Sequence, residues 1–81
     1  MKVRLLFFAV LRDVTGKRDD LLDLPDGTSA DDVWRRLCDQ HAALRGYSRP
    51  PMTAINESYA DPEQVLRDGD ELAFIPPVAG G

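Results

Sequence analysis

The chain has 81 residues, of which 43% are hydrophobic and 30% charged, and its net charge is −4 at neutral pH. This length suits one small domain that buries roughly 60% of the surface of its unfolded chain. The basic residues form no cluster, which argues against nucleic-acid binding. No apolar run approaches the roughly 20 residues of a membrane-spanning helix, and the single cysteine, Cys38, cannot form an internal disulfide. These features predict a cytoplasmic protein that binds neither nucleic acid nor membrane.

The first quarter of the chain predicts a strand, a helical turn and a second strand. Residues 2–9 alternate as a strand does, and the face expected to be buried carries Val3, Leu5 and Phe7. The opposite face becomes apolar only near its end, at Leu6 and Phe8. A short helical turn stopping at Gly16 follows, and residues 18–25 form a second strand with Leu22 and Leu24 on one face.

The stretch "PDGTSADD" predicts the start of the main helix. Asp26 and Gly27 make a turn, and Thr28 or Ser29 supplies the N-cap oxygen. Asp31 and Asp32 then place negative charge in the first turn, where the helix dipole favours it. An apolar stripe recurs at steps of three and four residues and extends the helix from about Ser29 to Leu44, before Gly46; its members are Val33, Leu37, Cys38, His41 and Leu44.

The second half of the chain predicts strands over residues 52–56, 58–60 and 71–76, with a helical turn and an Asp68-Gly69-Asp70 tight turn before the last of them. In the last strand Leu72 and Phe74 share one face, and Ala73 and Ile75 share the other. The order of elements best fits an α+β fold of the ubiquitin-like β-grasp type, a mixed sheet with one main helix packed on one face. Its first and last strands are expected to lie parallel at the sheet centre. We expect residues 1–75 to form this domain and residues 76–81 an extended flexible tail.

The side chains of the domain predict no catalysis. Cys38 and His41 lie on the apolar stripe of a helix, where burial raises a thiol pKa and no helix terminus lowers it. The sequence has no Cys-x-x-Cys pair and no glycine-rich loop between a strand and a helix. We therefore expect that this chain binds no cofactor and no metal and has no catalytic side chains of its own.

The ending "IPPVAGG" predicts a reactive terminal carboxylate. Pro76 and Pro77 stiffen an extended segment, and Val78 and Ala79 then taper toward Gly80 and Gly81. Glycine leaves the terminal carboxyl group unhindered by any Cβ. Activation by ATP would give an acyl-adenylate, which an amine would convert to an amide and a sulfur nucleophile to a thiocarboxylate.

A docking surface is expected beside this tail. If the first and last strands are adjacent, Leu6, Phe8, Ala73 and Ile75 form one apolar patch on the face turned away from the core. Such patches usually mark interfaces. Tyr59, in the returning segment, is expected to border the patch.

The stretches "LLFFAVLRDVTG", "LPDGTSADDV", "AINESYA" and "LRDGDELAFIPPVAGG" resemble the MoaD family, the small sulfur carrier subunit of molybdopterin synthase. The resemblance implies that a MoeB-type, E1-like enzyme uses ATP to adenylate Gly81, which then becomes a thiocarboxylate. The tail would enter a MoaE-type large subunit, which holds the catalytic side chains, and donate sulfur to cyclic pyranopterin monophosphate within a heterotetramer. Positions matching Phe8, Tyr59 and Ile75 contact the large subunit in that family; Tyr59 and Ile75 here replace leucine-like and phenylalanine residues.

Two other functions fit the same ending. Thiazole-type sulfur carriers also end in Gly-Gly, although they are usually shorter and lack "AFIPPVAGG". A ubiquitin-like modifier would be joined to lysines through Gly81 and shares the adenylation step.

Overall fold

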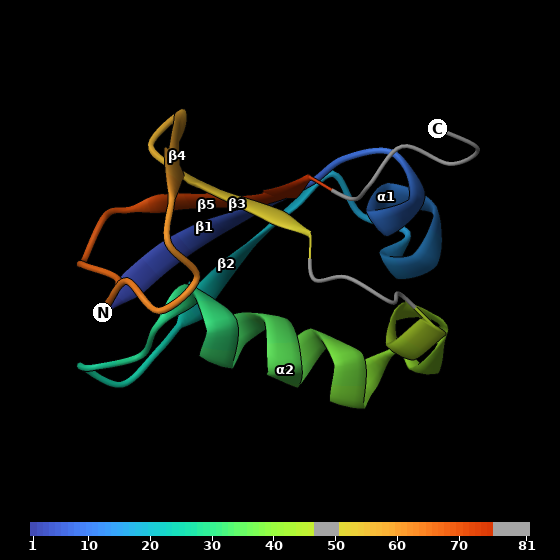
Figure 1. Cartoon of the computed structure of the whole chain (residues 1–81), viewed down its shortest axis with the longest axis horizontal. Helices are drawn as coiled ribbons and strands as arrows, with labels where there is room; N and C mark the ends of the chain where they lie inside the picture. The colour runs from blue at the N-terminus through green and yellow to red at the C-terminus, as the bar shows by residue number, and fades with distance from the viewer. Residues whose placement is uncertain (47–50, 76–81) are drawn as a thin grey trace.

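The computed structural model describes residues 1–46 and 51–75 (Figure 1), so the predicted tail, residues 76–81, lies outside the described residues. The elements in chain order are β1 (Lys2–Phe7), α1 (Val10–Thr15), β2 (Asp19–Asp23), α2 (Ala30–Gln40), the 3₁₀ helix η1 (Ala42–Gly46), β3 (Met52–Ile55), β4 (Ser58–Ala60) and β5 (Glu71–Ile75).

The five strands form one mixed sheet in the order β2-β1-β5-β3-β4. Strands β1 and β5 pair in parallel at its centre, and every other pair is antiparallel. Helix α2 lies across one face of this sheet (Figure 1). The β-grasp prediction is therefore confirmed, including the parallel pairing of the first and last strands.

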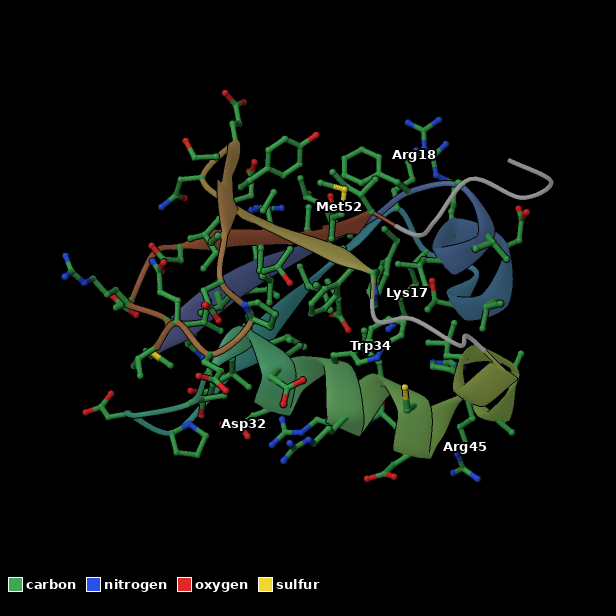
Figure 2. The ribbon with its side chains drawn as sticks, viewed as in Figure 1. Lys17, Arg18, Asp32, Trp34, Arg45 and Met52 are labelled. Atoms are coloured by element: carbon green, nitrogen blue, oxygen red, sulfur yellow. The ribbon has the colours of Figure 1, made fainter. Side chains whose placement is uncertain are left out.

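The core lies between α2 and the sheet. As the alternation predicts, the inward side chains of β1 and β5 are buried, and α2 adds apolar side chains from the opposite side. Trp34 of α2 meets Phe74 of β5 edge to face, with ring centroids 5.2 Å apart and an interplanar angle of 61°. Figure 2 shows Trp34 between the helix and the sheet, whereas Met52 lies at the sheet.

The beginning of α2 is held by a capping box. The Ser29 hydroxyl accepts the Asp32 N–H at 3.2 Å, and the Asp32 carboxylate accepts the Ser29 N–H at 3.0 Å. This hydrogen bond from the Ser29 backbone is the main reason why the pKa of Asp32 lies below its ordinary value. Of the two predicted cap residues, Ser29 is therefore the one used.

The helical turn predicted before the last strand is present only as a single turn, in which the Gln64 N–H donates to the Asp61 carbonyl at 2.9 Å. It does not continue as a helix, because the next backbone groups bond to the start of α2. The N–H groups of Ala30 and Asp31 donate to the carbonyls of Gln64 and Pro62, at 3.2 and 2.7 Å. An isolated bridge between Ser29 and Val65 continues this pairing. The segment thereby satisfies helix-terminal donors that have no partner within the helix.

The predicted end of α2 at Leu44 is also wrong, because the helix ends at Gln40. His41 is extended, with φ −131°, and the chain continues as η1, which buries Leu44. The Arg45 side chain donates to the carbonyls of Cys38 and Asp39, at 2.9 and 3.3 Å, and so caps the last turn of α2. The apolar residues of α2 and η1 follow one helical spacing, so the sequence predicted a single helix.

Strand β1 ends at Phe7, two residues earlier than predicted, because a tight turn follows. Ala9 has φ 49° and ψ −125°, and the Leu11 N–H donates to the Phe8 carbonyl at 3.0 Å. These values match the first central position of a type II′ turn, which glycine normally occupies. The turn ends the strand and brings Phe8 to the rim of the sheet.

Candidate functional site

Four side chains form a row across the sheet face turned away from α2. Leu6 pairs with Ala73, Ala73 with Ala54, and Ala54 with Tyr59. Directly paired residues of neighbouring strands point to the same face, so the row crosses β1, β5, β3 and β4.

This row lies in a hollow of about 330 Å³, which we call the open-face groove. It is lined by Leu6, Phe8, Ala54, Glu57, Tyr59, Glu71, Ala73 and Ile75. Phe8, Tyr59 and Ile75 are exposed over 42%, 72% and 36% of their surface. Exposed aromatic and aliphatic side chains gathered in one hollow are typical of a protein-binding site.

All five predicted docking residues of the domain therefore come together. Ala73 differs from the prediction in one respect: it is only 8% exposed, since it forms the floor of the groove between larger side chains. The other predicted contacts, Pro76, Pro77, Val78, Ala79, Gly80 and Gly81, lie outside the described residues.

The sequence interpretation missed Ala54, Glu57 and Glu71 in the groove, and Met52 beside it. Met52 is 54% exposed and pairs with Ile75, which places it on the same face. The alternation of Met52 and Ala54 was a usable signal, but which residue of β5 each would meet depends on a register that the sequence does not contain.

The open-face groove is apolar at one end and charged at the other. Phe8, Ile75 and Met52 lie toward the carboxyl end of β5. Four residues before Ile75, at the start of the strand, Glu71 pairs with Arg4. The apolar end is also where the chain passes from Ile75 into residues 76–81. A partner that covers this end would therefore lie beside Ile75, the last described residue before residues 76–81.

The β3–β4 hairpin, which carries Tyr59, is fixed to β5 by Asn56. Its amide oxygen accepts the Glu71 N–H, and its amide NH₂ donates to the Asp70 carboxylate, both at 2.9 Å. The Asn56 N–H also donates to the Glu71 carbonyl at 2.8 Å. Asn56 and Glu57 both have positive φ, at 52° and 70°, as a two-residue hairpin turn requires. Hydrogen bonds from both the side chain and the backbone of Asn56 therefore hold the groove wall in place.

Cys38 and His41 do not form a nucleophilic pair. Burial raises the pKa of the Cys38 thiol, and its Sγ lies 4.0 Å from the Leu44 carbonyl as a weak donor. A protonated, half-buried thiol is a poor nucleophile. Within residues 1–46 and 51–75, no three potential metal ligands gather in one place. Over the same ranges, no helix is long and apolar enough to cross a membrane.

The fold and the open-face groove define a ubiquitin-like β-grasp domain, and comparisons with known proteins agree. The model of the ThiS family matches residues 5–81. A molybdopterin synthase sulfur carrier subunit from Chlamydomonas reinhardtii is 35% identical over the whole of both chains. The small archaeal modifier protein 1 of H. volcanii is 27% identical, with a TM-score of 0.78 over 95% of this chain and 98% of that one.

A third similar protein comes from a complex of subunits 1 and 2 of the molybdopterin-converting factor of Helicobacter pylori. Its chain is 23% identical, with a TM-score of 0.66 over 100% of both chains, and at this identity it supports the fold alone. The chain therefore belongs to the ThiS family, among the molybdopterin synthase sulfur carrier subunits. The resemblance drawn from the sequence is confirmed.

Proposed function

We propose that this chain is the sulfur carrier subunit of a molybdopterin synthase and that the carboxyl group of Gly81 carries the sulfur. The observation that carries this proposal is the open-face groove, whose apolar end lies where β5 leads into residues 76–81. A large subunit that covers Phe8 and Ile75 would lie next to the start of residues 76–81, so Gly81 could reach the active site of that subunit.

The chemistry of the tail proceeds in two displacements. The Gly81 carboxylate attacks the α-phosphorus of ATP, which releases pyrophosphate and leaves an acyl-adenylate. Hydrosulfide (HS⁻) supplied by a donor then attacks the acyl carbon, and AMP leaves with the electron pair of the broken C–O bond. The product is a thiocarboxylate, whose sulfur is donated to cyclic pyranopterin monophosphate.

We expect the chain to bind two other proteins. A MoeB-type, E1-like enzyme would bind ATP and perform the activation, and a MoaE-type large subunit would supply the catalytic side chains. The 35% identical relative from Chlamydomonas reinhardtii is named as one subunit of a molybdopterin synthase, which supports a second subunit as partner. The two kinds of subunit would form a heterotetramer in the cytoplasm. This chain would bind no cofactor of its own.

The experiment is intact mass spectrometry of the chain after incubation with the activating enzyme, ATP and a sulfur donor. We expect a mass increase equal to the replacement of one oxygen by sulfur. A matched control carries one extra residue after Gly81, which should abolish the mass change and leave thermal unfolding unaltered. Sulfur transfer by the extended chain would contradict the proposed terminal chemistry.

Protein modification is a second candidate function, since the chain is similar to a small archaeal modifier protein. Both functions begin with the same acyl-adenylate and differ in the nucleophile that follows. If lysine-linked conjugates form and no thiocarboxylate is detected, the modifier function replaces the sulfur carrier function.

A further inference from the structure

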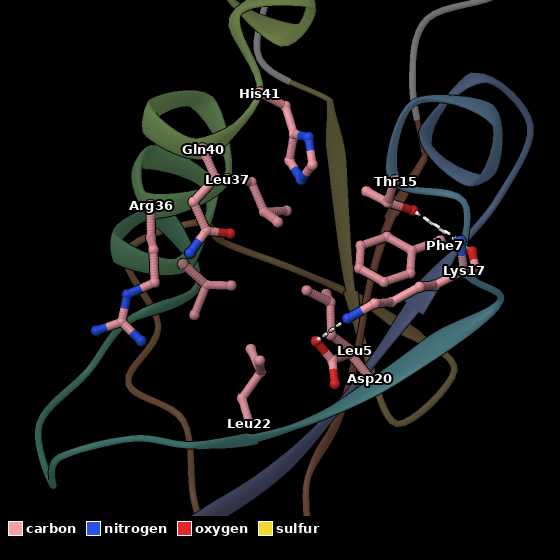
Figure 3. Close-up of a pocket in the computed structure, with 11 residues that line it drawn as sticks. Leu5, Phe7, Thr15, Lys17, Asp20, Leu22, Arg36, Leu37, Gln40 and His41 are labelled. Atoms are coloured by element: carbon pink, nitrogen blue, oxygen red, sulfur yellow. Dashed lines mark hydrogen bonds and ion pairs between the residues drawn. The ribbon is translucent and has the colours of Figure 1, made fainter.

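A second hollow lies on the opposite side of the sheet from the open-face groove, between β2 and the second half of α2 (Figure 3). Its volume is about 200 Å³, which is below the roughly 300–1,000 Å³ of pockets for drug-sized ligands. We call it the β2–α2 groove. Its apolar lining includes Leu22, Val33 and Leu37. Lys17, Arg36 and His41 also line it, as Figure 3 shows. Its size suits side chains of a peptide better than a cofactor.

The strand beside this groove has one free edge. Strand β2 is the last in the sheet order and pairs only with β1 among the described strands. Met1 and Leu24 exchange two backbone hydrogen bonds of 2.8 Å, and the Phe7 N–H donates to the Arg18 carbonyl at 2.9 Å.

These bonds fix the direction of every backbone group in β2. Hydrogen-bonded pairs recur at every second residue of an antiparallel ladder, so the N–H and C=O groups of Asp20 and Leu22 face β1. The groups of Asp19, Leu21 and Asp23 face outward. An extended peptide can bond to such an edge as an added strand, and its side chains on the α2 side would then enter the β2–α2 groove.

The charges around the groove indicate which peptide fits. All three aspartates of β2 are already paired, with Arg4, Lys17 and Lys2 at 3.6, 3.3 and 3.1 Å. Arg36 makes no ion pair with any residue of 1–46 or 51–75, whereas its neighbour Arg35 pairs with Asp31 at 2.9 Å. A carboxylate on the incoming peptide would give Arg36 a partner.

A second copy of the chain fits this edge poorly. In two β2 strands brought together, every aspartate of the incoming strand is already paired within its own chain, so none is free to become the partner of Arg36. The edge and the groove therefore favour a different partner.

We propose that the β2 edge and the β2–α2 groove together bind an extended segment of another protein, with apolar side chains that enter the groove and an acidic side chain that pairs with Arg36. The segment adds a sixth strand beyond β2. This surface is separate from the open-face groove, so both can be occupied in one molecule.

The test uses the full, ¹⁵N-labelled chain and a short synthetic peptide with an alternating run of valine and isoleucine followed by aspartates. We expect amide shifts in β2 and around Arg36 and Leu37, but not at Phe8 or Tyr59. Replacing the aspartates of the peptide by lysines should weaken binding. Sedimentation of the chain alone should show no self-association through β2.

Two variants of the protein separate the edge from the groove. Arg36→Glu should weaken the peptide roughly tenfold, because it turns an attraction into a repulsion, and its matched control Arg35→Glu should bind as the wild type does. Leu21→Pro removes an outward N–H that the β1 ladder does not use, which edge strands tolerate, and it should abolish strand addition while the domain stays folded.

The proposal is overturned if Leu21→Pro binds the peptide normally, if the lysine peptide binds equally well, or if the shifts centre on the open-face groove. Self-association through β2 would likewise replace the proposed partner by a second copy. None of these outcomes bears on the mass change expected at Gly81, so this inference and the sulfur carrier function fail separately.

Discussion

The two faces of the sheet use the same kinds of side chain for opposite purposes. Phe74 points to the covered face, is 1% exposed and packs against Trp34, whereas Phe8 lies at the open face and is 42% exposed. The covered face needs one helix to bury it, and β1 and β5 contribute to both faces. Along both strands, alternate side chains therefore serve stability on the covered face and recognition on the open face.

Truncation of one phenylalanine on each face should give the largest contrast. Phe74→Ala leaves a cavity under α2 and should lower the free energy of unfolding by about 3–5 kcal/mol, a large part of what a small domain has. Phe8→Ala removes a half-exposed ring and should cost about 1 kcal/mol or less. Urea unfolding of both variants measures the difference, and equal losses would contradict the separation of the faces.

A charge placed on the open face should reduce binding without unfolding the domain. Phe8→Asp should weaken the affinity for a molybdopterin synthase large subunit roughly 10- to 100-fold, because it replaces an aromatic contact by a charge that the partner would have to desolvate. Leu21→Asp is the matched control, since Leu21 is 59% exposed on the same face but lies outside the groove. Titration calorimetry distinguishes them, and an unchanged affinity for Phe8→Asp would show that the partner binds elsewhere.

Relief of the turn at Ala9 should stabilise the chain slightly. A non-glycine residue in this conformation costs about 1–3 kcal/mol, and glycine returns about 0.5–1 kcal/mol of that through its greater unfolded-state entropy. Ala9→Gly should therefore raise stability by about 1 kcal/mol in thermal unfolding. A loss of stability would mean that Ala9 is not strained, and the position of Phe8 would then need another explanation.

The smallest expected effect is a pH dependence at the start of α2. The pKa of Asp32 in the folded chain lies below its ordinary value of 3.8, so its contribution is present above pH 3.8 and is lost as the pH falls below it. The urea concentration at the midpoint of unfolding should fall as the pH drops below 3.8, and it should fall less steeply in Asp32→Asn. Asp23→Asn is the comparison on the open face, where an exposed pair with Lys2 contributes little. Equal slopes in wild type and Asp32→Asn would contradict the role of the capping box.

The sequence predicted what depends on local chemistry. Alternation located β1 and β5, and the order Ser29, Asp31 and Asp32 located the start of α2. Side chains alternate between the two faces of a strand. Once the first and last strands were placed side by side, this alternation put Leu6, Phe8 and Ile75 on one face.

What the sequence did not predict depends on contacts between distant segments. The row through Ala54 needs the register of β3 on β5, and the segment around Gln64 takes its conformation from the N–H groups of α2. The end of α2 at Gln40 depends on Arg45, which caps it from the following helix. The local spacing of apolar residues contains no information about these contacts.

The parallel pairing of β1 with β5 has a kinetic consequence. Phe7 meets Phe74 across nearly the full length of the described chain, and such long loop closures slow folding. A nascent chain that stops before Glu71 lacks the strand that joins β1 to β3, and both would be left with open edges. The sheet can therefore close only after β5 has been made, and a partner that recognises the folded sheet would not bind chains that stop before Glu71.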